Sequence, residues 1–290
     1  MRLLTRAAGD GERLAVATHG DTIVDVADLL GDGPWTMTRL LADVDTTLAA
    51  IRRELALGHA LPTRMPADIV VLPPVTRPGK IIAVGRNYHE HAAEEGQVAP
   101  ADPVVFAKFP NSLVGDRADI VWRAADTRQV DYEAELAVVI GRQARDVPAS
   151  RAFDHVLGYT CLNDVSARDL QFGDGQWVRG KSLDTFCPIG PWIVTTEELR
   201  DPGTLRIRCL VNGEVVQDAR TSEMVHDVPR LIAFCSRFMT LEPGDVIATG
   251  TPGGVGVFRQ PPRFLADGDE VVVEIDGIGR LVNQCRVLGD

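Results

Sequence analysis

The stretch that most constrains this 290-residue chain is VDYEAELAVVIG, from Val130 to Gly141. Its alternating residues predict a β-strand. Side chains two positions apart on a strand share a face, so Asp131, Glu133 and Glu135 should project together. Neighbouring carboxylates repel one another, and the apolar run AVVIG indicates a strand that enters a core. A hard divalent cation would resolve this conflict, whereas a solvated strand face is the simpler alternative.

The composition excludes several classes of partner. A net charge of −11 without a basic cluster argues against nucleic acid. The five cysteines are odd in number and never form a C-x-x-C pair, which indicates reduced thiols rather than disulfides or a zinc site. No signal peptide is evident, and no window approaches the ~18 apolar residues of a membrane span. We therefore expect a cytoplasmic protein that binds neither nucleic acid nor a membrane.

Residues 1–73 are predicted to form a small N-terminal α+β domain without catalytic groups. Two short strands should flank the turn Gly9-Asp10-Gly11, and a third is expected in DTIVDVADL, residues 21–29. Apolar residues at helical spacing predict one amphipathic helix from Trp35 to Leu57, which Gly58 ends. The proline-rich residues 73–80 are predicted to be a linker.

Residues 74–290 are predicted to form a second domain, mainly β with some α, in which the sheets are antiparallel or mixed. Asn212-Gly213 and Asp276-Gly277 lie between strand-like segments and are typical of two-residue hairpins. The segments EPGD, residues 242–245, and DGDE, residues 267–270, indicate turns that each open a strand rich in β-branched residues. Candidate chemical groups cluster in this domain.

A histidine and a glutamate follow the predicted strand IIAVG, in the segment RNYHEHAAEE. His91 and Glu94 are three residues apart and so share a helix face, where the carboxylate can orient the imidazole. A histidine held in this way suits a general base, although a surface contact is the simpler alternative. His89 is a rival candidate, but its spacing places it on a different face from Glu94.

A third carboxylate, Asp164, precedes a predicted helix in YTCLNDVSARDLQ. It would complete an oxygen-rich site with Glu133 and Glu135, and three carboxylates suit Mg²⁺ or Mn²⁺ better than zinc. Alternatively, Asp164 caps the helix.

The same helix carries further polar residues. Arg168 and Gln171 should point toward the region of Asp164. Ser166 and Asp169 have the spacing of a capping box and are predicted to be structural.

Two later segments offer a cation and backbone donors. Lys181, in WVRGKSLDTFCPIGP, can place an ammonium against an enolate or carboxylate, although most lysines are solvated. The glycine-rich loop from Gly250 to Gly256 can form an anion-binding nest with the Thr251 hydroxyl, or it is a tight turn. The loop matches neither a phosphate-binding P-loop nor a dinucleotide fingerprint.

Six segments, in this order, resemble the motifs of the fumarylacetoacetate hydrolase superfamily. They are GRNYHEHAAE, PVVFAKFPNSLVG, VDYEAELAVVIG, NDVSARDLQ, GKSLDTFCPIGP and LEPGDVIATGTPGGVG. The resemblance extends from about Lys80 to Val287 and points to the branch of acylpyruvate hydrolases and 2-hydroxyhepta-2,4-diene-1,7-dioate isomerases. It implies a mixed β-sandwich roll and assembly as a homodimer.

The resemblance also implies a role for each candidate residue. The positions that hold the metal, Mg²⁺ or Mn²⁺ with Ca²⁺ conceivable in a crystal, are Glu133, Glu135 and Asp164. His91 and Glu94 match a dyad on a mobile lid that activates water, and Lys181 matches the catalytic lysine. The positions that line the substrate pocket are Arg168, Gln171 and Thr251.

These features predict a metal-dependent enzyme that acts on a small 2-oxo acid. The main hypothesis is a hydrolase that cleaves a C–C bond in a 2,4-dioxo acid, an acylpyruvate such as fumarylpyruvate, and releases pyruvate as an enolate. The alternative is a decarboxylase or a tautomerase/isomerase, acting on oxaloacetate or on a 2-hydroxy-dienedioate of aromatic catabolism. A non-catalytic metal-binding β domain is the third alternative.

Overall fold

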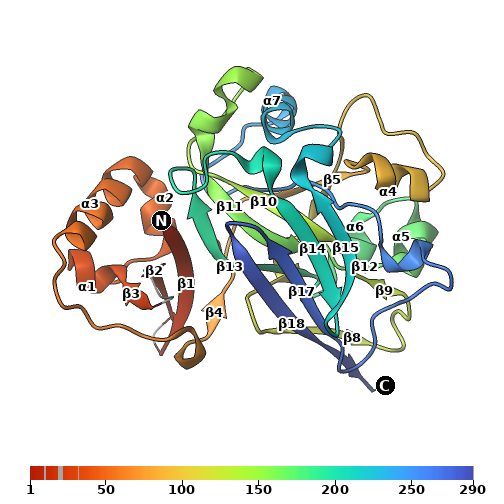
Figure 1. Cartoon of the computed structure of the whole chain (residues 1–290), viewed down its shortest axis with the longest axis horizontal. Helices are drawn as coiled ribbons and strands as arrows, with labels where there is room; N and C mark the ends of the chain where they lie inside the picture. The colour runs from red at the N-terminus through yellow and green to blue at the C-terminus, as the bar shows by residue number, and fades with distance from the viewer. Residues whose placement is uncertain (10, 19–21, 32, 290) are drawn as a thin grey trace.

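A computed structural model describes residues 1–9, 11–18, 22–31 and 33–289 of the chain (Figure 1). The predicted turn Gly9-Asp10-Gly11 and the start of DTIVDVADL lie partly outside the described residues. The predicted fold class, mainly β with some helix, is confirmed.

One sheet of eleven strands runs through the molecule. Its main path, in spatial order, is β3 (Ile23–Asp25), β2 (Gly11–Ala17), β1 (Arg2–Ala8), β13 (Cys187–Thr195), β11 (Val156–Asn163), β10 (Ala134–Ile140), β16 (Val246–Ala248), β5 (Ile81–Gly85) and β6 (Val104–Lys108). Two short strands complete it: β4 (Val71–Leu72) pairs with β1, and β7 (Leu113–Val114) pairs with β13. Every residue of β10 is buried, so this central strand has protein on both faces.

A second sheet of five strands packs against the first. Its order is β15 (Glu214–Arg220), β14 (Arg206–Val211), β17 (Glu270–Ile275), β18 (Gly279–Leu288) and β8 (Asp119–Arg123). Asn212-Gly213 joins β14 to β15 as predicted, with φ of 53° and 80° at the two residues. The turn at Asp276-Gly277 is longer than predicted, because Ile275 pairs with Gly279 and leaves three residues between them.

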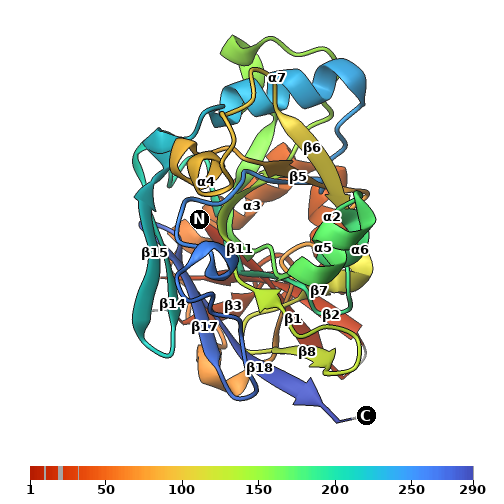
Figure 2. The same cartoon turned by 90° about the vertical axis from the view of Figure 1, so that its right-hand side faces the viewer.

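The helices and a two-stranded ribbon surround the sheets. The ribbon pairs β9 (Val130–Asp131) with β12 (Ser166–Ala167). The α-helices are α1 (Val26–Leu30), α2 (Met37–Ala42), α3 (Val44–Ala56), α4 (His89–Glu94), α5 (Arg168–Asp174), α6 (Val178–Lys181) and α7 (Val228–Phe238). The 3₁₀ turns are η1 (Pro66–Asp68), η2 (Pro110–Ser112), η3 (Ala149–His155), η4 (Pro202–Thr204), η5 (Thr221–Glu223) and η6 (Gly256–Phe258). Helices α4, α5 and α6 gather at one end of the molecule, on the right of Figure 1 and facing the viewer in Figure 2. Within the described ranges, no helix is long and apolar enough to cross a membrane.

The leading segment differs from its prediction at two places. The single helix expected from Trp35 to Leu57 is two helices, because Asp43 leaves the helical conformation and its carboxylate accepts from the Thr46 N–H to cap α3. The third strand is short, since the chain enters α1 directly after Asp25.

The leading segment and the rest of the chain share one sheet. Strand β1 pairs with β13, and its Leu3 packs in a core with Val139, Leu157 and Ile193. The linker predicted at residues 73–80 is packed against the rest of the protein, because its Val75 belongs to the same core. The division into residues 1–73 and 74–290 stays a prediction, with a continuous sheet across it.

Candidate active site and metal centre

The acidic strand predicted from Val130 to Gly141 is interrupted in its middle. Strand β9 ends at Asp131 and β10 begins at Ala134. In the gap, side chains accept the backbone hydrogen bonds: the Glu133 N–H donates to Asn163 Oδ1 at 3.0 Å, and the Ala134 N–H to Gln217 Oε1 at 2.9 Å. The prediction that the three acids project together is therefore wrong for Asp131, which binds other groups.

Glu133, Glu135 and Asp164 form a buried cluster of carboxylates. One ligand oxygen of each lies within 4.8 Å of the others. Burial, followed by the charges of Asp164 and Glu133, raises the pKa of Glu135 well above its usual range. Such a cluster of hard oxygen donors, whose mutual repulsion a cation would relieve, fits a divalent ion such as Mg²⁺ or Mn²⁺.

Lys181 lies at the end of α6 and contacts two of these three carboxylates. Its Nζ is 2.7 Å from Glu133 Oε2 and 2.8 Å from Asp164 Oδ2. Burial lowers the pKa of Lys181, but the two carboxylates outweigh it and the net shift is upward. The preceding Gly180 is required for this packing, because a Cβ there would lie 2.7 Å from the backbone nitrogen of Gln171.

A second buried lysine, Lys108, was not identified from the sequence. Its Nζ lies 2.6 Å from Asp164 Oδ1 and also donates to the carbonyl of Lys181. Lys108 is the last residue of β6 and is 1% exposed. In the sequence Lys108 only ends the apolar run VVFA, which does not show that its side chain is buried.

Arg168 and Gln171, which the sequence placed together, meet on α5. Arg168 Nη1 lies 2.7 Å from Glu133 Oε1 and 3.0 Å from Gln171 Oε1. Burial alone would lower the pKa of Arg168. The charges of Asp131 and Glu133 outweigh burial and raise this pKa overall, so the guanidinium stays charged. Its Nη2 is buried and has no hydrogen-bond partner among the described residues, which leaves one donor for an anionic ligand.

The glycine-rich loop binds carboxylates of the protein itself. Three backbone N–H groups donate at 2.8 Å to three acids: Gly250 to Glu135, Gly254 to Glu94, and Gly256 to Asp131. Thr251 Oγ1 accepts from Gln217 Nε2 at 2.8 Å. The predicted anion nest is thus engaged by side chains from α4, β9 and β10, which fixes the loop against the site.

Asp131 links this loop to Arg168. Its Oδ1 accepts from the Gly256 N–H, while its Oδ2 lies 2.8 Å from Arg168 Nε and 3.0 Å from the Val257 nitrogen. Asp131 is fully buried. It therefore acts on Arg168 and on the loop rather than on the metal cluster.

Helix α4 brings His91 into the same region, between two carboxylates. Glu94 Oε2 is 3.6 Å from Nδ1, which is too long for a hydrogen bond, and Glu95 Oε1 is 3.3 Å from Nε2. Glu95 was not identified from the sequence, although its i+4 spacing from His91 was the available signal. His89, the rival candidate, is exposed.

The capping box predicted at Ser166 and Asp169 is not formed. Ser166 lies in β12 and its hydroxyl donates to the Asp164 carbonyl at 2.8 Å, while Asp169 accepts from Thr127 Oγ1 at 2.6 Å. Helix α5 begins at Arg168, and none of the described side chains caps it, so Asp164 is not a helix cap either. Pairing of β12 with β9 holds this segment extended.

A small cavity of about 20 Å³ connects these groups. Its lining includes the predicted His91, Glu133, Arg168, Gln171, Lys181 and Thr251, together with Arg86, Glu95 and Trp177. Glu135 and Asp164 are not among its lining residues, but Asp164 contacts Lys181, which is.

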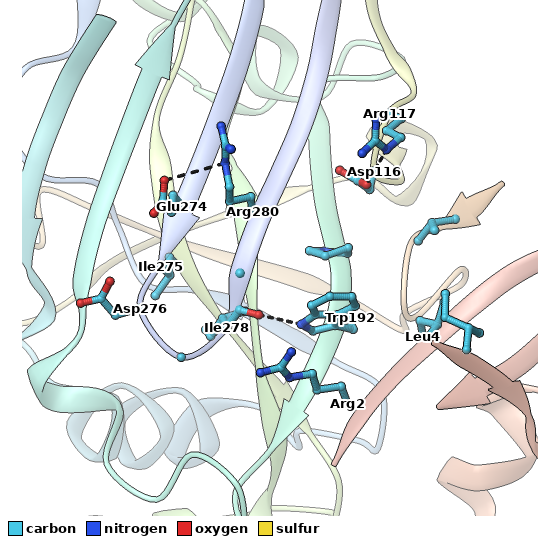
Figure 3. Close-up of a pocket in the computed structure, with 15 residues that line it drawn as sticks. Arg2, Leu4, Asp116, Arg117, Trp192, Glu274, Ile275, Asp276, Ile278 and Arg280 are labelled. Atoms are coloured by element: carbon cyan, nitrogen blue, oxygen red, sulfur yellow. Dashed lines mark hydrogen bonds and ion pairs between the residues drawn. The ribbon is translucent and has the colours of Figure 1, made fainter. Parts of the chain in front are cut away.

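A larger cavity of about 530 Å³ lies elsewhere, between β1 and the β17–β18 hairpin (Figure 3). Trp192 crosses it to donate to the Ile278 carbonyl at 2.7 Å. Some charged side chains that line it pair with one another: Arg280 Nε lies 3.8 Å from Glu274 Oε2. The smaller cavity is the candidate active site, because Glu133, Lys181 and His91 all line it.

The chain is similar to known proteins over most of its length. The family described as fumarylacetoacetate (FAA) hydrolase C-terminal matches residues 80–286. The oxaloacetate tautomerase FAHD2A of Bos taurus, named as mitochondrial, is 44% identical over 268 residues, which span 92% of this chain and 84% of that protein.

Solved structures share the whole fold. The 2-hydroxyhepta-2,4-diene-1,7-dioate isomerase of Mycobacterium marinum has a TM-score of 0.78 at 39% identity, with 100% of both chains covered. The maleylpyruvate hydrolase of Sphingobium sp. SYK-6, solved with manganese(II) and pyruvate, has a TM-score of 0.83 at 37% identity, again with 100% of both chains covered. The chain belongs to the fumarylacetoacetate hydrolase family.

Proposed function

We propose that this protein is a metal-dependent tautomerase or isomerase of a small 2-oxo acid, with oxaloacetate as the first candidate substrate. The observation that carries the proposal is the buried ammonium of Lys181, held by Glu133 and Asp164 in a cavity that His91 also borders. A fixed cation and an imidazole in one small cavity can stabilise an enolate and move a proton. The name of the bovine relative supports this over acylpyruvate hydrolysis, our main expectation from the sequence.

The metal, when bound, would be held by Glu133, Glu135 and Asp164 and would polarise the 2-oxo group as a Lewis acid. Arg168 Nη2 offers a donor to the substrate carboxylate. His91 removes a proton from the carbon next to the keto group.

The ammonium of Lys181 donates a proton to the resulting enolate oxygen, which yields the enol, and both protons return in the reverse direction. Since Glu133 and Asp164 hold the lysine charged, the donor is in place before the substrate binds.

The test is a pair of assays on metal-stripped protein with Mg²⁺ or Mn²⁺ added back. We expect metal-dependent conversion between enol and keto oxaloacetate, followed by ultraviolet absorbance, while total oxaloacetate is conserved. Pyruvate formation from oxaloacetate would instead indicate a decarboxylase. Metal binding without turnover of oxaloacetate or acylpyruvate would favour the non-catalytic alternative.

The Glu135→Ala variant tests the assigned metal cluster. Removal of this ligand should abolish metal binding and turnover together, because only two carboxylates remain. Calorimetric titration with Mn²⁺ and the oxaloacetate assay are measured on the same preparation. Full activity with unchanged metal affinity would disprove the assignment.

Hydrolysis of an acylpyruvate is the second candidate. The resemblance to the maleylpyruvate hydrolase favours it, because that protein shares the fold over the full length of this chain. Acetylpyruvate serves as the probe: release of pyruvate and acetate would establish C–C cleavage, in which His91 activates a water.

Assembly and location are two further proposals. We propose a homodimer, which light scattering of the purified protein tests directly. We also propose a cytoplasmic location, although the name of the bovine relative places that protein in mitochondria. Fractionation of the source cells decides this point.

A further inference from the structure

A second arginine, Arg86, borders the cavity in a position fixed by the backbone. It follows β5 directly and has a φ of 56°, a left-handed conformation that few residues other than glycine adopt. Its guanidinium lies 5.5 Å from the centre of the Trp177 ring. A Cβ on the preceding Gly85 would lie 2.4 Å from that ring, so glycine is required for Trp177 to pack here.

Glu95 connects this arginine to the histidine. Its Oε2 lies 2.7 Å from Arg86 Nε, and its Oε1 lies 3.3 Å from His91 Nε2. The Glu95 carboxylate therefore contacts one nitrogen of each residue. Glu95 directly follows the short helix α4, and its side chain remains 18% exposed.

The cavity thus has cationic donors from two separate elements. Arg168 of α5 has an unpartnered Nη2 among the described residues, and Arg86 follows β5. Carboxylates bind arginine through paired, charge-assisted hydrogen bonds. Two arginines around one small cavity match a substrate with two carboxylates.

We propose that Arg86 binds the second carboxylate of a dicarboxylic substrate and that this carboxylate displaces Glu95. The proposal rests on the proposed function and names the residue that selects diacids. A cavity of about 20 Å³ has room for about one water molecule, so a four-carbon diacid enters only when a lining side chain moves. Displacement of Glu95 also leaves His91 Nε2 without this carboxylate, whereas a monocarboxylate leaves Glu95 in place.

The test compares the binding of two probes to the Mg²⁺-loaded protein by calorimetry. The diacid probe is 3,3-difluorooxaloacetate, which has no proton on C3 and cannot tautomerise, and the monoacid probe is pyruvate. We expect Arg86→Gln to weaken diacid binding about 10- to 100-fold through the loss of a charged hydrogen bond, and to change pyruvate binding less than about threefold. Arg86→Lys should recover part of the loss.

For Glu95→Gln we expect the opposite effect on diacid binding. Removal of the competing carboxylate should tighten diacid binding while pyruvate binding stays within about threefold. Arg142→Gln is the matched control, because this exposed arginine pairs with Asp45 far from the site and should leave both probes unaffected.

Equal weakening of both probes in Arg86→Gln, or no weakening of the diacid, would overturn the proposal. A melting temperature close to that of wild type shows that Arg86→Gln folds. If Arg86→Gln does not fold, Arg86→Lys is used for the same comparison. Because these are binding measurements, selective loss of the diacid supports the role of Arg86 even where oxaloacetate is not turned over. Turnover with diacid binding insensitive to Arg86 overturns this inference alone.

Discussion

Two buried lysines control the charge of the carboxylate cluster. Lys108 pairs with one oxygen of Asp164, and Lys181 takes the other together with Glu133. Glu135 receives only the Gly250 N–H among the hydrogen bonds of the described residues. Burial, followed by the charges of Asp164 and Glu133, raises the pKa of Glu135, so it is the carboxylate that gains most from a bound metal.

Replacement of Lys181 should separate metal binding from turnover. In Lys181→Met, Glu133 and Asp164 lose a competing ammonium, so we expect Mn²⁺ to bind as tightly as in wild type or more tightly. Turnover should fall by about 100-fold or more, because the enolate loses its cation. Mn²⁺ titration by electron paramagnetic resonance, beside the oxaloacetate assay, measures both quantities. Weaker Mn²⁺ binding in the variant would show that Lys181 supports the metal site instead.

The sequence predicted candidate site residues that lie close together along the chain, and it missed those that meet only through the fold. Glu133 and Glu135 lie two positions apart on one segment. Their spacing, and the apolar run that follows them, indicated a buried acidic pair. Lys108 contacts Asp164 across 56 positions, and no local pattern reports such a contact. Glu95 was hidden by Glu94, since both lie within a helical turn of His91.

Among the elements, the glycine-rich loop makes contacts that local sequence could not predict. Its backbone N–H groups bind acids from three other elements. The motif predicted free donors for an external anion, because sequence alone does not show which carboxylates the fold brings near them.

A methyl group at Gly256 should damage this arrangement. A Cβ there would lie 1.9 Å from the Arg263 carbonyl oxygen and 2.6 Å from Asp131 Oδ1, so the loop must shift away from Arg168. We expect Gly256→Ala to destabilise the protein by about 1–3 kcal/mol, measured by urea unfolding, and to raise the KM for oxaloacetate.

Gly173→Ala is the matched control for this loop variant. Gly173 lies in helix α5, and a Cβ there would meet nothing within 4 Å. Its replacement should be neutral or stabilise by up to about 1 kcal/mol, because alanine is the better helix former. Equal stability of Gly256→Ala and wild type would contradict the packing that we describe.

The helices show a different limit of local patterns. Apolar residues keep helical spacing from Trp35 to Leu57, so periodicity alone predicts one helix. The side chain of Asp43 instead binds the first turn of α3, and this cap ends the continuity. The expected capping box does not form for a related reason. Ser166 pairs with β9 in the β9–β12 ribbon, so α5 begins only at Arg168.

For the whole molecule, long-range strand pairing decides what sequence analysis could not. The hairpin at Asn212-Gly213 was predictable because it is local. The pairing of β1 with β13 joins residues that lie almost 200 positions apart, as Arg2 and Val194 do. Prolines in residues 73–80 resembled a linker, whereas Val75 packs in the core that both parts of the chain build.

The five buried cysteines make the stability of this shared structure sensitive to alkaline pH. They lie on β11, β13, β14, β18 and α7, so their burial depends on both sheets and on the longest helix of the second half. Burial raises the pKa of Cys187 and Cys285 to about 12 and that of Cys235 to about 11. At pH 8 and below, the thiols are mostly neutral in both the folded and the unfolded chain. Above pH 9, the unfolded chain loses these protons first, so the free energy of unfolding falls as the pH rises toward the folded pKa.

We therefore expect each buried thiol to cost about 1 kcal/mol of stability between pH 8 and pH 10. Urea unfolding at both pH values, on wild type and on Cys235→Ala, isolates one thiol. The variant is less stable at pH 8 because it loses packing under α7, but it should lose about 1 kcal/mol less than wild type on going to pH 10. Identical losses in the two proteins would mean that this thiol already ionises in the folded state, and that α7 does not exclude water from the core beneath it.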